Sequence, residues 1–218
     1  SPEVWPNVIK MMLPGDDSYL NELSMNESGW PNSASLMIPK DIFRSMYGQD
    51  FFDGLIKELE NNGYKENESL FVFPYDWRWD IDWVAGSSPY PLIKSLKDKV
   101  EEVKQKTGTD KVDIVAHSMG GLVAKQYINF YGSSSVDKFI DIGTPHLGAP
   151  KAFKILMYGD NLGFKIGKFS INETTVKNIS QNFPSIFELL PSKKYFDSNE
   201  VNYSNFISDT NRAIPWNV

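Results

Sequence analysis

The chain has 218 residues, which is enough for one α/β domain with a sizeable hydrophobic core. Its 22 basic and 28 acidic residues give a net charge of -6 and leave no basic stripe, which argues against a nucleic-acid partner. The absence of cysteine excludes disulfides and thiolate metal sites, and no apolar run approaches the roughly 18 residues of a transmembrane helix. No metal-ligand cluster is evident, so we expect neither a metal nor another cofactor.

The first part of the chain predicts an irregular segment, then a helix and a strand. Residues 1–45 scatter Pro, Gly, Asn and Ser among apolar residues, as surface loops and short helices do. From about Gln49 to Asn62, apolar residues share one helical face, and Gly63 ends the pattern. The short apolar run Leu70–Phe73, ended by Pro74, predicts a buried strand.

The central part predicts alternating helices and strands, which indicate a parallel sheet with right-handed crossovers. We expect, in order, a helix over Pro91–Lys106, a strand over Lys111–Ala116, a helix over Met119–Tyr131 and a strand over Val136–Ile142. After Gly143 only short helical pieces are expected, near 176–179 and 185–190, as in a cap. The predicted division is a core with a surface-wrapping N-terminal segment at 1–145, and a lid at 146–218.

Ser118 stands between a predicted strand and a predicted helix, in Ala116-His117-Ser118-Met119-Gly120-Gly121. A small-x-Ser-x-Gly pattern is weak alone, but a catalytic serine turn must follow a buried strand and open a helix, as here. Such a turn is strained, and the chain passes close on either side, so Ala116 and Gly120 must be small. We interpret Ser118 as a nucleophile and the Met119 backbone N–H as an oxyanion donor at the helix N-terminus.

The alternatives near this turn are structural. His117 follows the strand beside Ser118, but adjacent residues on a sharp turn point apart, so packing is favoured over general-base chemistry. Asp113 lies too early in the strand to orient a base and is interpreted as a structural polar residue. An ordinary strand-to-helix turn with a serine cap remains the alternative for Ser118 itself.

Two further segments leave the ends of predicted strands. In Gly143–Pro150, His146 could act as a base, but no orienting acid follows, so a site wall or loop anchor is favoured. In Pro74–Asp80, Asp76 and Arg78 are expected to form a local ion pair under aromatic rings. Trp77 and Trp79 fit an acyl site or simple packing equally well. The substrate-binding candidates are His117, His146, Leu147 and Trp77.

Taken together, the segments resemble the lecithin:cholesterol acyltransferase-like family of α/β-hydrolases. The matching stretches are Leu70–Arg78, Ala116–Gly121, Gly143–Pro150 and Phe183–Ser192. The resemblance implies an α/β-hydrolase fold with a lid, and a Ser-Asp-His triad acting on lipid esters by hydrolysis or acyl transfer. It also implies peripheral contact with a lipid surface.

The resemblance further implies that the chain is an internal portion of such a hydrolase. The acid and the base of the triad follow the nucleophile in this fold, yet no histidine occurs after His146. The family's oxyanion loop, and the strand before it, would precede residue 1. We therefore expect this chain alone to be inactive, with the missing strands supplied by the rest of the polypeptide or by another copy.

Two hypotheses on function follow. The first is a serine esterase, lipase or phospholipase, or an acyltransferase, that works through an acyl-enzyme on Ser118. The second is a catalytically silent fragment or lipid-binding module of the same fold. An extracellular bacterial lipase would fit a cysteine-free chain rich in Asn and Lys.

Overall fold

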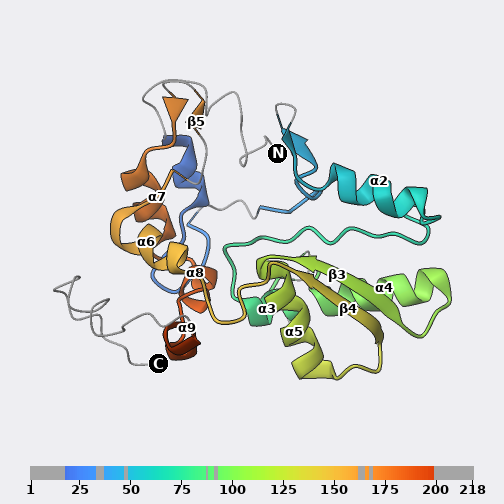
Figure 1. Ribbon diagram of the computed structural model, residues 1–218. Helices are drawn as coiled ribbons and strands as arrows, with labels where there is room; N and C mark the ends of the chain where they lie inside the picture. The colour runs from blue at the N-terminus through green and yellow to red at the C-terminus, as the bar shows by residue number, and fades with distance from the viewer. Residues whose placement is uncertain are drawn as a thin grey trace. The chain divides into compact units, whose positions relative to one another are not determined.

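The structure is a computed structural model that describes residues 18–32, 37–46, 49–86, 88–90, 93–161, 165–166 and 169–198 (Figure 1). The chain divides into two units, and each is described by itself. The sheet unit holds the described parts of Ser24–Thr144 and Asn182–Ser185, and the helical unit holds those of Ser1–Leu23, Pro145–Gln181 and Ile186–Val218. The predicted division into a core and a lid stays a prediction.

The centre of the sheet unit is a parallel pair of strands joined by a helix (Figure 1). Strand β3 (Val112–His117) pairs with β4 (Val136–Ile142), and α5 (Met119–Tyr131) connects them and packs against both. The bounds of α5 and β4 are those predicted, and β3 lies one residue further along than expected. Helix, sheet and crossover together place the chain in the α/β class.

Two more helices pack against this centre on the side of α5. Helix α4 (Leu96–Thr107) contacts α5 and β3, and the short helix α3 (Ile81–Ala85) contacts α5. The predicted helix over 91–106 was wrong at its start, because a capping box at Ser95 and Asp98 sets the first turn. In that box, the Ser95 Oγ accepts from the Asp98 N–H at 3.3 Å, and the Asp98 carboxylate accepts from the Ser95 N–H at 2.9 Å.

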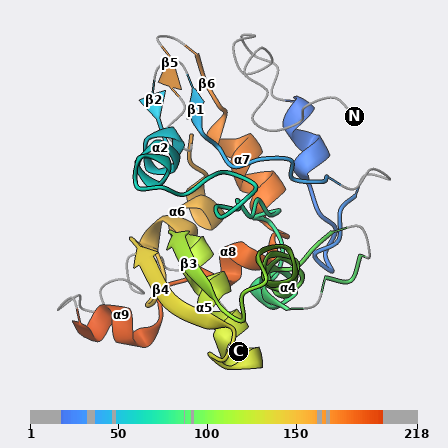
Figure 2. The ribbon, with the colours of Figure 1, turned by 90° about the vertical axis from the view of Figure 1, so that its right-hand side faces the viewer.

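Helix α2 (Asp53–Asn61) lies on the other side of the β3–β4 layer from α5, as both ribbon views show (Figures 1 and 2). It begins later than predicted because 49–50 form strand β2 (Gln49–Asp50), which pairs with β1 (Ser45–Met46) in a short hairpin. The Arg44 carbonyl accepts the N–H groups of residues 51, 52 and 53 at 2.9, 2.9 and 3.2 Å. A backbone carbonyl therefore fixes where α2 begins.

The strand predicted at Leu70–Phe73 is wrong. Residues 71–76 form no helix or strand, and Leu70 makes only an isolated bridge with Glu66. Within the part of the chain that the structure describes, β3 pairs with β4 alone, and no strand lies hydrogen-bonded to residues 71–73. An apolar run becomes a strand only when a neighbouring strand pairs with its backbone N–H and C=O groups. The apolar pattern alone was therefore not sufficient to predict a strand here.

The helical unit is built from a 3₁₀ helix and several α-helices. Its elements are η1 (Ser18–Leu23), α6 (Pro150–Tyr158), the antiparallel strands β5 (Lys165–Ile166) and β6 (Phe169–Ser170), α7 (Glu173–Ser180) and α9 (Lys193–Ser198), together with the last three residues of α8 (Pro184–Glu188), whose first two belong to the sheet unit. Helix α7 packs against α6 and η1, with Leu20, Phe153 and Val176 buried. The predicted helical pieces near 176–179 and 185–190 are present, whereas α6 and α9 were missed. In the described residues, no helix is both long and apolar enough to cross a bilayer.

Candidate active site

Ser118 forms the turn between β3 and α5. Its backbone has φ 53° and ψ -128°, a left-handed conformation that costs a residue with a side chain about 1–3 kcal/mol. The Ser118 N–H donates to the Ile142 carbonyl at 2.9 Å, which ties the turn to the end of β4. The strained turn predicted at this residue, with a strand before it and a helix after it, is therefore present.

The tightest approach to the backbone near Ser118 is at Gly121, where the Thr144 side chain lies against it. A Cβ at Gly120 would lie 3.7 Å from the Tyr75 hydroxyl and 3.9 Å from the Ala116 Cβ, which are ordinary contacts. At Gly121 a Cβ would lie only 1.9 Å from the Thr144 Oγ1. An alanine would therefore fit at position 120, and the expectation that this position must be small stays a prediction, while the loop after β4 leaves no room for a side chain at the next residue.

The first turn of α5 presents N–H groups with no acceptor in the described structure. No hydrogen bond is made there by the Met119 or Gly120 N–H, while the Gly121 N–H donates to the Ser118 carbonyl at 3.0 Å. Unpaired N–H groups and the positive end of the helix dipole favour a negatively charged oxygen. The start of α5, directly after Ser118, therefore presents two N–H groups that are free to donate within the described structure.

His117 is exposed at the end of β3, on the strand face that also carries Val115. Its ring meets the Phe52 ring edge-on, with centroids 5.3 Å apart. This contact agrees with the predicted packing, and its place in substrate binding stays a prediction. The backbone N–H of Phe52 donates to the Arg44 carbonyl at 2.9 Å, just before the start of α2.

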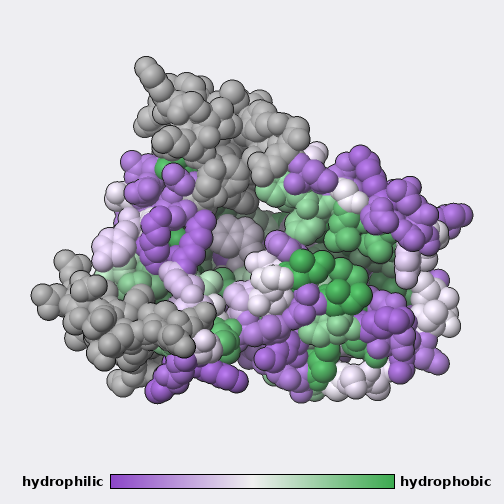
Figure 3. Space-filling model, in the orientation of Figure 1, coloured by the Kyte–Doolittle hydropathy of each residue, from purple (hydrophilic) through white to green (hydrophobic). Residues whose placement is uncertain are grey.

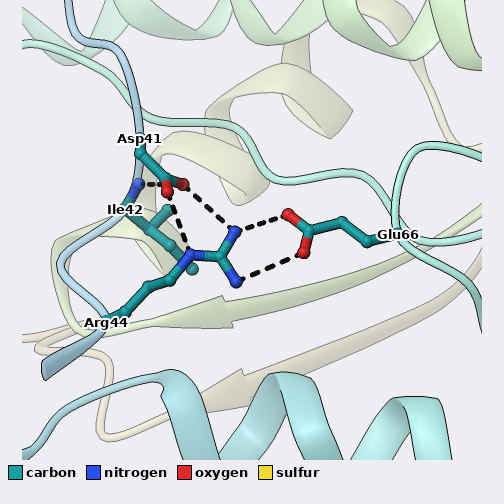
Figure 4. A network of polar contacts seen from close by, with 4 residues as sticks. All are labelled: Asp41, Ile42, Arg44 and Glu66. Atoms are coloured by element: carbon teal, nitrogen blue, oxygen red, sulfur yellow. Dashed lines mark hydrogen bonds and ion pairs between the residues drawn. The ribbon is translucent and has the colours of Figure 1, made fainter.

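The side chain of Arg44 is itself clamped between two carboxylates (Figure 4). Its guanidinium donates to Asp41 through Nε at 2.9 Å, and it also binds Glu66 from the turn before residue 70. The hydrogen bond from Arg44 lowers the pKa of the Asp41 carboxyl below its ordinary value. Arg44 thereby joins the segment before β1, the start of α2 and the turn at Glu66.

The predicted Asp76–Arg78 ion pair is confirmed. Both side chains are buried, with exposed fractions of 7% for Asp76 and 1% for Arg78, and the Arg78 Nε donates to the carboxylate at 2.8 Å. Trp77 between them is 37% exposed and meets the buried Phe183 ring edge-on. Trp79 is buried against other aromatic rings, which favours packing over an acyl site.

The loop that holds His146 and Leu147 lies in the helical unit. The Leu147 carbonyl accepts from the Ser192 N–H at 2.9 Å and from its Oγ at 3.1 Å, and the Ala149 N–H donates to the Leu189 carbonyl at 2.7 Å. Two stretches that carried the resemblance, 143–150 and 183–192, are therefore bonded to each other through their backbones. The imidazole of His146 is exposed, and its role, like that of Leu147, stays a prediction.

Sequence reasoning missed two hydroxyl groups beside the first turn of α5. The Tyr75 hydroxyl lies near Gly120, and the Thr144 Oγ1 is buried against Gly121 without a hydrogen-bond partner in the described residues. Desolvation of the Tyr75 phenol raises its pKa above the ordinary value, although its ring keeps some exposure. Both residues lie in stretches that carried the family resemblance, but nothing in the sequence indicated that they would approach α5. Among the described residues, no group of three His, Asp or Glu could hold a metal ion.

The lecithin:cholesterol acyltransferase family model matches residues 39–215, which is more than half of the chain. The chain belongs to the lecithin:cholesterol acyltransferase family. The predicted resemblance is thus confirmed, and the small parallel sheet with its helices fits the α/β-hydrolase fold of this family.

Relatives within the lecithin:cholesterol acyltransferase family show how much of such a protein the chain covers. A phospholipase A(1) of Arabidopsis thaliana is 28% identical over 86% of this chain and 40% of its own length. The phosphatidylcholine-sterol acyltransferase of Mus musculus is 34% identical over 51% of the chain and 25% of its own. The lysosomal phospholipase A and acyltransferase of Bos taurus is 26% identical over 69% and 37%. The chain therefore spans less than half the length of these relatives.

Proposed function

We propose that this chain carries the nucleophile of a lipid acyl hydrolase or acyltransferase, with Ser118 as the attacking group and the Met119 N–H as an oxyanion donor. The observation that supports it most is the positive φ of Ser118 at the junction of β3 and α5, followed by N–H groups that have no acceptor among the described residues. A strained backbone persists only where the surrounding structure maintains it, and such residues are concentrated at functional sites.

In the proposed reaction, the Ser118 Oγ attacks the carbonyl carbon of an ester while a general base takes its proton. The carbonyl oxygen becomes an oxyanion that the Met119 N–H stabilises. Collapse of this intermediate breaks the bond to the alcohol, which leaves with the proton, and an acyl-serine remains. In hydrolysis, water attacks the acyl-serine and releases a fatty or other carboxylic acid; in acyl transfer, an acceptor alcohol attacks it and leaves as the new ester.

The substrates we propose are lipids or other carboxylic esters, approached at a lipid surface. Support comes from the relatives, which are named as a phospholipase A(1), a phosphatidylcholine-sterol acyltransferase and a lysosomal phospholipase A and acyltransferase. The exposed aromatic ring of Trp77 would suit a wall for an acyl chain, as would the rings of His117 and Phe52.

We also propose that the triad acid and base, and further strands of the sheet, come from outside these 218 residues. The chain holds only two histidines, His117 and His146. Parallel sheets are ordinarily covered on both faces, yet Val115, Ile140 and Ile142 are 41–50% exposed. The space-filling view shows apolar residues gathered over β4 and α5 (Figure 3). Further chain, or another copy, would cover them.

The test is labelling with a fluorophosphonate, read by intact mass, on the 218-residue chain and on a form extended at both ends. The extended form should gain one label, which Ser118→Ala abolishes. The 218-residue chain should label weakly or not at all, because no base activates the hydroxyl. An extended form that folds and stays unlabelled would overturn the proposal and favour the silent lipid-binding module.

A further inference from the structure

Tyr75 approaches the Ser118 turn from a separate segment of the sheet unit. It follows the extended residues 71–73, and its ring stacks on Phe73 with centroids 5.9 Å apart. Its hydroxyl lies 3.7 Å from the place where Gly120 would carry a Cβ. Gly120 is the second residue of α5, and its N–H and that of Met119 have no acceptor among the described residues. A third donor therefore lies beside these two.

The hydroxyl of Tyr75 has no hydrogen-bond partner within the described part of the chain. The side-chain hydrogen bonds and ion pairs of its segment run between Asp76 and Arg78 instead. The hydroxyl is not among the buried side-chain atoms that lack a partner in the described residues, so it keeps contact with solvent. A ligand held at the Ser118 turn could therefore take up this hydroxyl in place of water.

We propose that Tyr75 is a substrate-binding residue whose hydroxyl donates a hydrogen bond to an oxygen of the ester held at Ser118. The inference rests on the proposed function and adds a donor to it. The Tyr75 side chain and the first turn of α5 converge from segments more than forty residues apart, and both present donors with no acceptor. An oxygen-rich ligand such as an ester supplies the acceptors that both lack.

The phenol acts here as a neutral donor, and it takes no proton from Ser118. Desolvation raises the pKa of Tyr75 from its ordinary value of 10.0, so the hydroxyl keeps its proton throughout the working range of an esterase. Its contribution should therefore be independent of pH up to about 10. A base, in contrast, would lose its effect as the pH fell through its pKa.

The test compares Tyr75→Phe with Tyr64→Phe, in which the hydroxyl removed belongs to an exposed ring. Both variants are made in the form that labels at Ser118. The kcat/KM for a p-nitrophenyl ester is measured from pH 6 to pH 10, together with the urea midpoint of unfolding. Loss of one neutral hydrogen bond should lower kcat/KM about three- to tenfold in Tyr75→Phe at every pH, and leave Tyr64→Phe unchanged.

The urea midpoint separates substrate binding from a structural role. Because an unpaired hydroxyl is removed, Tyr75→Phe should unfold at the same urea concentration or a higher one. An unchanged kcat/KM in an enzyme that still labels at Ser118 would overturn this inference alone. A lowered urea midpoint would also overturn it, because it would reveal a structural hydrogen bond. Failure of the parent itself to label would overturn the proposed function and this inference with it.

Discussion

Replacing Asp76 by Asn should strongly destabilise the sheet unit. The change keeps the shape of the side chain but removes the charge that faces Arg78, whose side chain is only 1% exposed. Removing one partner of a buried ion pair typically costs about 3–5 kcal/mol, because the remaining charge is left in a desolvated place. That loss is a large fraction of the roughly 5–15 kcal/mol that stabilises an ordinary domain.

The matched control is Glu68→Gln, the same carboxylate-to-amide change at an exposed pair. Glu68 and Lys65 are 71% and 72% exposed and 3.7 Å apart, so the control should cost less than about 1 kcal/mol. Urea unfolding followed by tryptophan fluorescence reports on this unit, which holds the rings of Trp30, Trp79 and Trp83. Asp76→Asn should lower the midpoint by about 1–3 M. Equal midpoints in the two variants would refute the reasoning.

Two further predictions concern the backbone and acid stability. Gly148→Ala should destabilise by about 2–5 kcal/mol, since φ is 92° and a Cβ would lie 2.3 Å from a backbone carbonyl. Gly132→Ala, at φ 74° in open space, should cost only about 1–2 kcal/mol, and equal urea midpoints would contradict the steric argument. Asp41→Asn should cost under about 1 kcal/mol at neutral pH. Because Arg44 lowers the pKa of Asp41, the difference in stability between the parent and Asp41→Asn should persist as the pH falls to the ordinary pKa of 3.8. It should vanish once the pH is below the lowered pKa of the folded protein. A difference that did not change between pH 6 and pH 2 would speak against the ion pair.

The local sequence pattern was sufficient to predict the structure of a segment where its partners are close in sequence. Helix α5 and strand β4 have the predicted bounds, and Gly132 ends α5 as expected. The turn at Ser118 followed from small residues between a strand and a helix. The ion pair of Asp76 and Arg78 spans two residues and was visible in the motif.

The local sequence pattern did not predict the structure of a segment where its partner is distant in the chain. Residues 70–73 look like a strand, but pairing depends on a neighbour that the pattern does not contain. The approach of Thr144 to Gly121, and of Tyr75 to Gly120, arises only when the ends of different segments meet at the carboxyl edge of the sheet. The clamp of Arg44 on Glu66 likewise joins residues 22 positions apart.

The most direct test of the central claim is where an acyl group becomes attached. The extended form would be incubated with vesicles of an ester lipid, quenched in acid and digested with trypsin. Cleavage after Lys111 and Lys125 releases residues 112–125, in which Ser118 is the sole hydroxyl-bearing residue. If Ser118 is the nucleophile, this peptide gains the mass of one acyl group, and the gain disappears in Ser118→Ala. An acyl group found on another peptide, or one that persists in Ser118→Ala, would contradict that role.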